Sequence, residues 1–403
     1  MYDYTLTEEQ QAFKDSVKKF AERELKPLVA KADAMEDPKE CWDLLAPVAK
    51  KSLQAGHGKL CIPEEYGGTG AGLIEFMILC EEIGYVDSGF ALSAMVTACA
   101  PRLLLNSPEE QKEKWLRPTG EDETGKYIWA FVSTEPYGGN EMICPLPDPK
   151  LGIHTTAVRD GKGYRIKGGT KVFITNGGVA EVYMLNCRTR PDRSNVNGCN
   201  WLMFTKDTPG YSIGKYEHKV GWRTSTNTTI YIDDMWIPEE DRVGPEGEGF
   251  WVIENILLEN AVGIAAISLG TMRAAYNLAL AHCKERVTWG KPIIEHQAVS
   301  SKLVNMRMKI EACRALTEKL AWAAMNPKLA QDGLGKLAKL AKFHSAMMVQ
   351  EVTNDAAYLF GGYGLMRGHP VEKLLRDGLP NRVVEGSIEA NQWTMANYDL
   401  DLI

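Results

Sequence analysis

The sequence predicts an α+β fold in which an antiparallel β domain lies between two helical domains. Helical spacing of apolar residues dominates the chain up to about residue 127. From 128 to 241, short β-branched and aromatic runs are separated by Gly, Asn, Asp and Pro, which is typical of antiparallel strands. From 242 to 403, long helices with short connections indicate a four-helix bundle. A chain of 403 residues is too long for one ordinary core, so we expect three domains, 1–127, 128–241 and 242–403.

The first domain begins with a clear helix signal. Thr7 and Gln10 have the spacing of a capping box. Apolar residues then recur at helical spacing until Pro27, which we expect to stop the pattern. The glycine-rich segment IPEEYGGTGAG (62–72) is expected to be a loop, and apolar stretches follow it.

The second and third domains differ in the length of their apolar runs. The candidate strands of the second domain lie in YIWAFVST, GYRIKGGTKVFITNGG, EVYMLNC, NWLMFTKDTPGYSIG and TTIYIDDMWIP. In the third domain, residues 249–287 fit one long helix, and two more are expected after Pro292 and Pro327. Because the β domain has a helical domain on each side, the clefts at its borders are candidate ligand sites.

Composition excludes several classes of partner. The net charge is −7 and the pI is about 5.7, which argues against a nucleic-acid surface but leaves an anionic ligand open. The nine cysteines are scattered singly without a C-x-x-C pair, as expected for reduced thiols in a cytoplasmic protein. The first residues have no basic or apolar leader region, and the longest apolar stretch, GFALSAMVTACAPRLLL, is interrupted by Pro101 and Arg102. We therefore expect neither a signal peptide nor a membrane span.

Common catalytic motifs are missing. The chain has no G-x-G-x-x-G fingerprint, no G-x-x-x-x-G-K-[ST] loop and no G-x-S-x-G elbow. Its seven histidines are dispersed, and no metal-ligand spacing occurs, so no metal site is expected. These absences disfavour nicotinamide, ATP, zinc and serine-hydrolase chemistry, and leave open a cofactor protein without a Rossmann motif.

One late segment, RVVEGSIEAN (382–391), contains a candidate general base. Glu385 stands directly before a glycine and shortly after Pro380. A solvated surface turn explains this arrangement simply. A general base explains it if the rest of the chain provides something for the carboxylate to act on.

Five segments decide between these two interpretations. They are FVSTEPYGGNE (131–141), KVFITNG (171–177), RVTWGKPIIEHQ (286–297), LFGGYG (359–364) and VEKLLRDGLPNRVVEGS (371–387). In the same order they resemble the signature segments of the acyl-CoA dehydrogenase family of flavoenzymes. Each match is weak alone, but five in register with the predicted helix–strand–helix order are specific, and they extend over nearly the whole chain.

The resemblance assigns Glu385 as the catalytic base. In this family the matching glutamate removes the proton α to a thioester carbonyl, the β-hydrogen leaves as hydride to N5 of FAD, and a 2-enoyl-CoA results. Desolvation suits this role because it raises the pKa of the carboxyl group. The backbone N–H of Glu385 and a flavin ribityl hydroxyl would form the oxyanion hole, and Gly386 would let the backbone approach the substrate.

The resemblance also implies an FAD site that two subunits share. The residues expected around the isoalloxazine ring are Phe131, Ser133, Thr134, Phe173 and Thr175. Those expected near a neighbouring subunit's FAD are Arg286, Trp289, Gln297, Gly361, Gly362, Ser387 and Glu389. Arg286 suits the pyrophosphate because a guanidinium can bind two charged oxygens. Taken singly, these residues also fit ordinary strands, a helix C-terminus and a plain turn.

A shared site implies a homo-oligomer, which for this family is expected to be a tetramer built as a dimer of dimers. The expected electron acceptor is electron-transfer flavoprotein rather than O₂. The length of the chain fits the dehydrogenases better than the related oxidases.

The sequence departs from the family pattern around the acyl site. Asn140 and Glu141 replace a Ser-Asp pair, which makes Asn140 a candidate substrate contact together with Gly386. Tyr358 and Leu365 also replace the usual residues beside the double glycine.

The long helix near residue 260 departs as well. Asn260 and its neighbours occupy the positions where the family usually has an arginine, and Glu259 lies near the position of the base in some branched-chain members. Glu259 is therefore a second candidate for the base. Because these changes cluster at the acyl site, a cyclic, branched or aromatic acyl group is expected. An oxidase, a decarboxylating dehydrogenase and a non-catalytic flavin- or acyl-CoA-binding scaffold remain alternatives.

Overall fold

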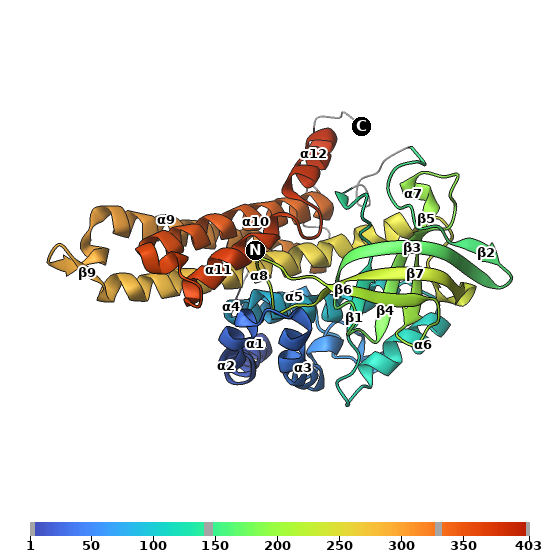
Figure 1. The fold of residues 1–403 in the computed structure, drawn as a ribbon, viewed down its shortest axis with the longest axis horizontal. Coiled ribbons are helices and arrows are strands. Elements are labelled where there is room, and N and C mark those ends of the chain that lie inside the picture. The colour runs from blue at the N-terminus through green and yellow to red at the C-terminus, as the bar shows by residue number, and fades with distance from the viewer. Residues whose placement is uncertain (1–4, 141–147, 327–332, 400–403) are drawn as a thin grey trace.

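The computed structural model describes residues 5–140, 148–326 and 333–399. Helices, then strands, then helices again follow one another along the chain, which confirms the predicted fold class (Figure 1). The first helices are α1 (Glu8–Phe20), α2 (Lys26–Ala34), α3 (Pro38–Gln54), α4 (Leu73–Val86), α5 (Ser88–Cys99) and α6 (Glu109–Gly120). The change to strands falls between α6 and β1 and the return to helices between β8 and α8. The exact domain boundaries stay predictions.

The capping box at the start of α1 is confirmed. Thr7 Oγ1 accepts a hydrogen bond from the Gln10 backbone N–H at 3.2 Å, and Gln10 Oε1 accepts one from Thr7 N–H at 3.0 Å. The expected stop at Pro27 is wrong. A π-helical segment, Ala21–Leu25, leads directly into α2, and Pro27 lies in the first turn of that helix. Proline is common at the start of an α-helix because its fixed φ suits the first turn.

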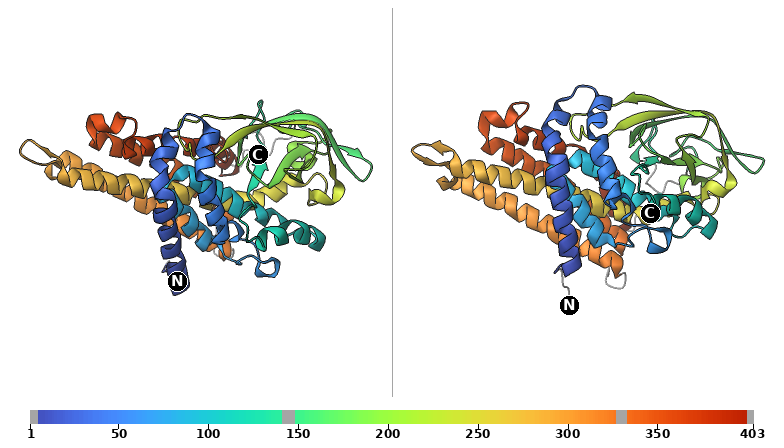
Figure 2. Two further views of the ribbon diagram at one scale, coloured as in Figure 1. Left: turned by 60° about the horizontal axis from the view of Figure 1, so that its bottom comes forward. Right: turned by 90° about the horizontal axis from the view of Figure 1, so that it is seen from below.

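Helices α4 and α5 pack against α8 (Gly249–Glu285), while α1 to α3 run across the long axis of the molecule (Figure 2). The crossing of α4 and α8 is close because it has glycine on both sides. A Cβ on Gly270 would lie 2.3 Å from the carbonyl oxygen of Glu81, and one on Gly84 would lie 3.1 Å from the Ile267 backbone. The N-terminal helices are thereby fixed to the central helix of the bundle.

The middle domain consists of two four-stranded sheets packed face to face over an apolar core. Its strands are β1 (Trp129–Val132), β2 (Val158–Asp160), β3 (Gly163–Thr175), β4 (Val182–Arg188), β5 (Cys199–Thr205), β6 (Tyr211–Tyr216), β7 (Asn227–Pro238) and β8 (Arg242–Val243), with a short helix α7 (Asn195–Gly198). The sheet orders are β1-β4-β5-β8 and β2-β3-β7-β6. The pairings are antiparallel as expected, except that β1 runs parallel to β4. Parallel pairing needs a crossover, and here β2 and β3 of the other sheet provide it.

The third group is a helical bundle around α8. It also contains α9 (Gln297–Met325), α10 (Leu334–Leu359) and α11 (Pro370–Gly378), and α12 (Ile388–Asp399) follows. A small hairpin, β9 (Val287–Thr288) with β10 (Lys291–Pro292), joins α8 to α9. Residues 258–285 of α8 are long and apolar enough to cross a membrane, but 61% of that window is buried inside the fold. Because α8 packs against α4, α9 and α10, core packing accounts for its apolar composition.

The described cysteines are buried and none forms a disulfide. Burial raises the pKa of the Cys61 thiol to about 12 and acts in the same direction on the Cys80 thiol, so these thiols stay protonated. Cys144 lies outside the described residues. Within the described ranges, no three His, Cys, Asp or Glu side chains gather in a way that could hold a metal ion.

Candidate functional site

Glu385 lies in the loop between α11 and α12, in a left-handed backbone conformation. Its φ is 52°, and that of Gly386 is 84°. A non-glycine residue in this region costs about 1–2 kcal/mol, and such strain persists where surrounding structure holds it in place. Here the ammonium of Lys342 in α10 donates hydrogen bonds to the backbone carbonyl oxygens of both Glu385 and Gly386.

Two cavities meet at Glu385. The larger, of about 770 Å³, lies between the β domain, α5 and the 380–387 loop. The smaller, of about 420 Å³, lies between the N-terminal half of α8, the start of α10 and α12. Glu385 and Asn260 line both cavities. Groups bound in the two cavities would therefore meet at the Glu385 carboxylate.

Asn260 orients this carboxylate. Its Nδ2 donates to Glu385 Oε2 at 3.0 Å, and its Oδ1 accepts a hydrogen bond from Cys99 Sγ at 3.3 Å. Burial raises the pKa of Glu385 above its ordinary value, against the opposing effects of the Lys342 charge and the Asn260 hydrogen bond. A carboxyl group with a raised pKa is suited to remove a proton near neutral pH.

Glu259, the second candidate base, is engaged elsewhere. Its Oε1 forms an ion pair with Arg102 Nε at 2.8 Å, and it lines neither cavity. Successive residues of a helix point about 100° apart, so α8 directs Asn260 toward the cavities and Glu259 toward Arg102. The geometry favours Glu385 as the base, and both assignments stay predictions.

The residues expected around the flavin ring come together in the larger cavity. Its lining includes Phe131, Ser133, Thr134, Phe173 and Thr175, and also Asn140, Gly386 and Ser387. They come from the ends of β1 and β3 and from the 380–387 loop. A buried ion pair holds the end of β1, because Lys171 Nζ lies 2.8 Å from Glu135 Oε1 and donates to the Ser133 carbonyl oxygen at 3.0 Å.

A bulge at the end of β3 places Phe173 and Thr175. The register against β7 shifts between Lys171 and Ile174, and Phe173 has a φ of 59° and is 64% exposed. Bulges redirect side chains in this way beside binding sites. Thr175 Oγ1 accepts a hydrogen bond from Asn227 Nδ2 at 3.2 Å. The hydroxyl hydrogen of Thr175 is therefore left to donate to a group in the cavity.

Asn140 joins the β domain to the loop of the candidate base. Its Nδ2 donates to Ser387 Oγ at 3.2 Å, and its Oδ1 accepts a hydrogen bond from the Ser387 backbone N–H at 3.0 Å. These two reciprocal hydrogen bonds give Asn140, which departs from the family pattern, a structural role. Glu141, which together with Asn140 replaces the family's Ser-Asp pair, lies outside the described residues.

The remaining predicted cofactor residues lie at the opposite end of the molecule, near the β9–β10 hairpin (Figure 1). They are Arg286, Trp289, Gln297, Gly361 and Gly362, and all are exposed. Phe360 stacks on His282 at 4.0 Å between ring centroids, which brings the double glycine close to the end of α8. One chain thus presents two sets of predicted cofactor residues in different parts of the fold. Glu389 belongs to neither set, because it lies in the first turn of α12, does not line the larger cavity and pairs with Arg382 at 3.1 Å.

Sequence reasoning missed several residues of the larger cavity. Lys219, Trp222 and Asn227 come from the segment between β6 and β7 and from the start of β7. Lys219 Nζ donates to the carbonyl oxygen of Ser225 at 2.6 Å and to Asn227 Oδ1. Burial lowers the pKa of Lys219 to about 7. The run KVGWRTSTN has no periodic pattern, so only its charged and aromatic residues next to glycine could have drawn attention to it.

Two buried polar atoms in this cavity lack partners. Among the described residues, Asn186 Oδ1 and Trp222 Nε1 have no hydrogen-bond partner, and both side chains line the larger cavity. Buried polar groups are normally satisfied. A planar ligand with both donors and acceptors along its edge would satisfy these two atoms, and the lining residues therefore fit a flavin ring.

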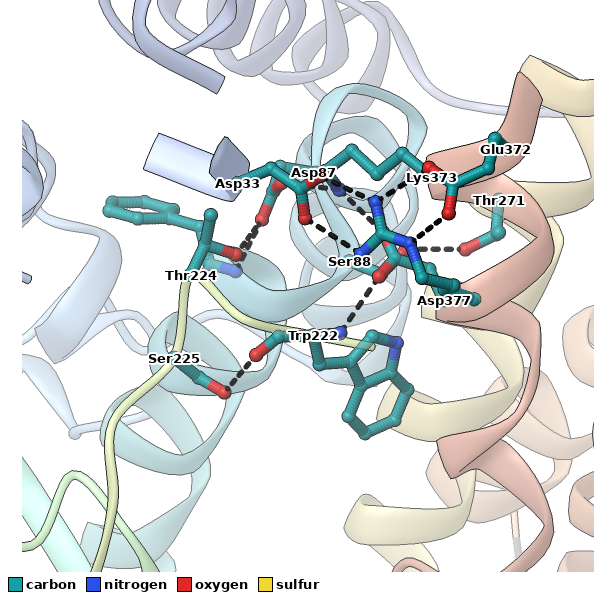
Figure 3. A network of polar contacts seen from close by, with 12 residues as sticks. Asp33, Asp87, Ser88, Trp222, Thr224, Ser225, Thr271, Glu372, Lys373 and Asp377 are labelled. Carbon is teal, nitrogen blue, oxygen red and sulfur yellow. Dashed lines mark hydrogen bonds and ion pairs between the residues drawn. The ribbon is translucent and has the colours of Figure 1, made fainter. Parts of the chain in front are cut away.

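A buried network of charges fixes the position of Trp222 (Figure 3). Lys373 of α11 lies 2.8 Å from Asp87 Oδ2 and 2.5 Å from Asp377 Oδ2. Asp377 Oδ1 in turn accepts a hydrogen bond from the Trp222 backbone N–H at 2.8 Å. Arg376 extends the network to Asp33 in α2. The network thereby joins all three groups of elements behind the cavity.

Three family models match the chain in succession: the N-terminal domain of acyl-CoA dehydrogenase over residues 7–123, the middle domain over 130–235 and the C-terminal domain over 247–397. The short-chain specific acyl-CoA dehydrogenase of Clostridium acetobutylicum is 35% identical over 397 residues, which cover 97% of each chain. The chain belongs to the acyl-CoA dehydrogenase family. The cyclohex-1-ene-1-carbonyl-CoA dehydrogenase of Geobacter metallireducens is 33% identical, with 95% of each chain covered.

A solved structure agrees with this assignment. The butyryl-CoA dehydrogenase of Megasphaera elsdenii superposes with a TM-score of 0.89 at 30% identity, covering 99% of this chain and 100% of that one. The resemblance found in the sequence is thus confirmed. The protein is an enzyme of the acyl-CoA dehydrogenase family, a family of FAD-dependent oxidoreductases.

Proposed function

We propose that the enzyme dehydrogenates an acyl-CoA thioester between Cα and Cβ, with Glu385 removing the α-proton. The observation that carries this proposal is the position of Glu385 between two cavities, with its pKa raised by burial. Among the described residues its backbone N–H has no hydrogen-bond partner. That N–H is available to the thioester oxygen, where negative charge develops as the proton leaves.

The larger cavity is the proposed place for the flavin ring. Thr134 and Thr175 would donate hydrogen bonds to its edge, and Phe131 and Phe173 would flank it. The unpartnered Asn186 and Trp222 atoms support this placement. FAD, when bound, supplies a hydride acceptor for the β-hydrogen. The protein's part is to hold the substrate's Cβ toward this cavity and its α-proton toward Glu385.

The smaller cavity is the proposed path for the acyl-CoA. Trp251, Leu258, Leu334 and Ala338 give it an apolar lining suited to an alkyl or pantetheine chain, and Lys339 provides a cation. A thioester entering there reaches Glu385 from the side opposite the flavin ring. Gly386, which lines the larger cavity, has no side chain that would crowd the flavin ring there.

A second copy of the chain is proposed to complete the FAD site. Arg286, Gln297, Gly361 and Gly362 do not line the larger cavity of their own chain, and the β9 hairpin lies at the other end of the molecule from the β domain (Figure 1). Trp289, beside them, is 95% exposed, so its side chain is accessible to a second copy. A homo-oligomer, as a tetramer built from such dimers, would bury Trp289 and bring the two sets together.

The acyl group and the electron acceptor belong to the same proposal. The neutral Asn260 beside Glu385 and the Asn140–Ser387 pair distinguish this site from the family pattern, which supports a cyclic, branched or aromatic acyl group. Electron-transfer flavoprotein is the proposed acceptor, and the cytoplasm the proposed location.

An anaerobic titration tests the proposal. The purified enzyme is mixed with straight, branched, cyclic or aromatic acyl-CoA thioesters while the flavin absorbance is followed. We expect one class to bleach the flavin of the wild type and of Glu259→Gln, and none to bleach Glu385→Gln, which should retain FAD. Bleaching of Glu385→Gln at the wild-type rate would overturn the assignment of the base.

The same preparation separates the alternatives. Rapid O₂ consumption would indicate an oxidase, and release of CO₂ from a dicarboxylic acyl-CoA would indicate a decarboxylating dehydrogenase. A yellow wild-type protein that no class bleaches would favour the non-catalytic scaffold.

A further inference from the structure

Lys342 is a buried cation next to the loop of the candidate base. It lies in the third turn of α10 and is only 3% exposed. Its Nζ donates to the Glu385 carbonyl oxygen at 3.1 Å and also to the Gly386 carbonyl oxygen. Burying a lysine ammonium costs free energy because the charge loses its contact with water, and two backbone carbonyl oxygens compensate only part of that loss.

The geometry of the loop depends on these contacts. Glu385 and Gly386 are consecutive left-handed residues, with φ values of 52° and 84°. Asn391 Nδ2 adds one more donor to the Gly386 carbonyl oxygen, at 3.1 Å. Because both carbonyl oxygens are held, the orientations of the two peptide groups that follow Glu385 and Gly386 are fixed. The Glu385 side chain is thereby fixed at the meeting point of the two cavities.

Lys342 also sets the electrostatic surroundings of Glu385. Burial lowers the pKa of Lys342 to about 8, while the charges of Glu385 and Glu389 act in the opposite direction. In return, the Lys342 charge lowers the pKa of Glu385 against the effect of burial. The two groups are thus coupled, and each favours the charged form of the other.

The other groups near Glu385 leave Lys342 as the main cationic influence. From α8 comes Glu259, whose charge is compensated by Arg102. From α5 comes the Cys99 thiol, whose pKa burial raises well above its ordinary value, so that it stays neutral. Lys339 lines the smaller cavity from α10, and Glu389 faces Lys342 from α12.

We propose that Lys342 is a positioning residue for Glu385, which holds the base in its left-handed loop through two backbone carbonyl oxygens and places a buried cation beside its carboxylate. This inference rests on the proposed function, because it assumes that Glu385 is the base. Lys342 needs no contact with the reacting atoms for this role. Its effect is transmitted through the two carbonyl oxygens and through the charge.

The test is the pH profile of anaerobic flavin reduction in wild type, Lys342→Met and Lys342→Arg. Methionine is an unbranched side chain one atom shorter than lysine and without its charge, and arginine keeps the charge at every accessible pH. In Lys342→Met we expect the rate at pH 7 to fall about 10- to 100-fold, as for a misplaced catalytic group. The acidic limb should move to higher pH, because the loss of the cation raises the pKa of Glu385.

The alkaline side of the profile gives a second, independent readout. The wild type should lose rate as Lys342 titrates near pH 8. Lys342→Arg should keep the acidic limb of the wild type but lose this alkaline limb. Lys309→Met is the matched control, since Lys309 pairs with Glu351 and lines neither cavity, and its profile should equal that of the wild type.

The outcomes separate this inference from the proposed function. If the wild type is not reduced by any acyl-CoA, the proposed function fails. The role of Lys342 is overturned if the wild type is reduced and the rate of flavin reduction in Lys342→Met or Lys342→Arg depends on pH as it does in the wild type. FAD content and melting temperature, measured for each variant, identify loss of the fold. If Lys342→Met does not fold, Lys342→Arg alone tests the proposal, by whether its rate still falls at alkaline pH.

Discussion

Replacement of Lys373 by methionine tests the buried charge network behind the larger cavity (Figure 3). Lys373 lies between Asp87 and Asp377, whose side chains are fully buried. The variant removes one cation and leaves two carboxylates facing each other without it. Removing one partner of a buried ion pair costs about 3–5 kcal/mol, because a charge remains buried and uncompensated. We expect a loss of that size in the free energy of unfolding at pH 8.

The pH dependence follows from the directions of the pKa shifts. Burial lowers the pKa of Lys373, but the charges and hydrogen bonds of Asp377 and Asp87 outweigh it, and the net shift is upward. A raised lysine pKa contributes stability that is present below the unfolded pKa of about 10.4 and is lost only above it. The wild-type contribution is therefore constant between pH 5 and pH 8.

In the variant the carboxyl groups dominate. Burial already raises the pKa of Asp377 in the wild type, against the charge of Lys373, and loss of that charge raises it further. A carboxyl group with a raised pKa contributes stability at low pH and loses it as the pH rises through the folded pKa. The deficit of Lys373→Met should thus be largest at pH 8 and should shrink toward pH 5.

The assay is urea unfolding of the FAD-saturated protein at a fixed protein concentration, because oligomer assembly shifts apparent stability by mass action. The control is Lys302→Met. Lys302 pairs with Asp355 at 2.6 Å, but its side chain is 37% exposed, so the loss should be about 0–1 kcal/mol. The double variant Lys373→Met/Asp377→Asn should recover part of the deficit. If Lys373→Met loses no more than Lys302→Met at pH 8, the reasoning about the network is wrong.

Two further predictions concern FAD binding. Thr175→Val keeps the shape of the side chain but removes the hydroxyl that Asn227 leaves free to donate, so the Kd for FAD should rise about tenfold, as for the loss of one hydrogen bond. A fluorescence titration of the apoprotein measures this, with Thr170→Val, which does not line the cavity, as the control; equal Kd values for the two variants would contradict the placement of the ring. Arg286→Ala should weaken FAD binding without lowering the melting temperature of the apoprotein, and reassembly of an inactive Arg286→Ala preparation with an inactive Glu385→Gln preparation should restore activity, because a mixed dimer contains one intact shared site. If the mixture stays inactive while mixed dimers form, the site is not shared.

Features of the fold that depend on local sequence could be predicted. The capping box of α1 involves residues three positions apart, and the long helices α8, α9 and α10 follow from apolar periodicity. The stop at Pro27 failed because a proline in the first turn of a new helix has the same local pattern as one that ends a helix. The parallel pairing of β1 with β4 could not be predicted, since it depends on a crossover through the other sheet.

The site was predictable only as far as motifs reached. Glu385 and the residues lining the larger cavity lie in segments that resemble known ones. Lys342 lies 43 residues before Glu385 in the sequence, in a run, KLAKLAK, where lysines recur every three residues. Such a run is typical of a solvated helix face, and only tertiary packing shows that one of these lysines is buried against the loop. Glu259 and Asn260 are likewise neighbours in sequence, but the helix sends one to Arg102 and the other to Glu385.

The loop that carries Glu385 is held near its α11 end and by a side chain from α10, which explains how it can retain a strained conformation. On the α11 side, Asn381 is fully buried, its Oδ1 accepts a hydrogen bond from Ser268 Oγ at 2.8 Å, and its Nδ2 donates to the Asp377 carbonyl oxygen at 3.0 Å. From α10, Lys342 donates hydrogen bonds to the carbonyl oxygens of Glu385 and Gly386. Because Asp377 also holds Trp222, the same network positions the base and one wall of the larger cavity. A change in the Asp87–Lys373–Asp377 cluster should therefore disturb the chemistry as well as the stability, whereas a change at Lys342 should act mainly on the base.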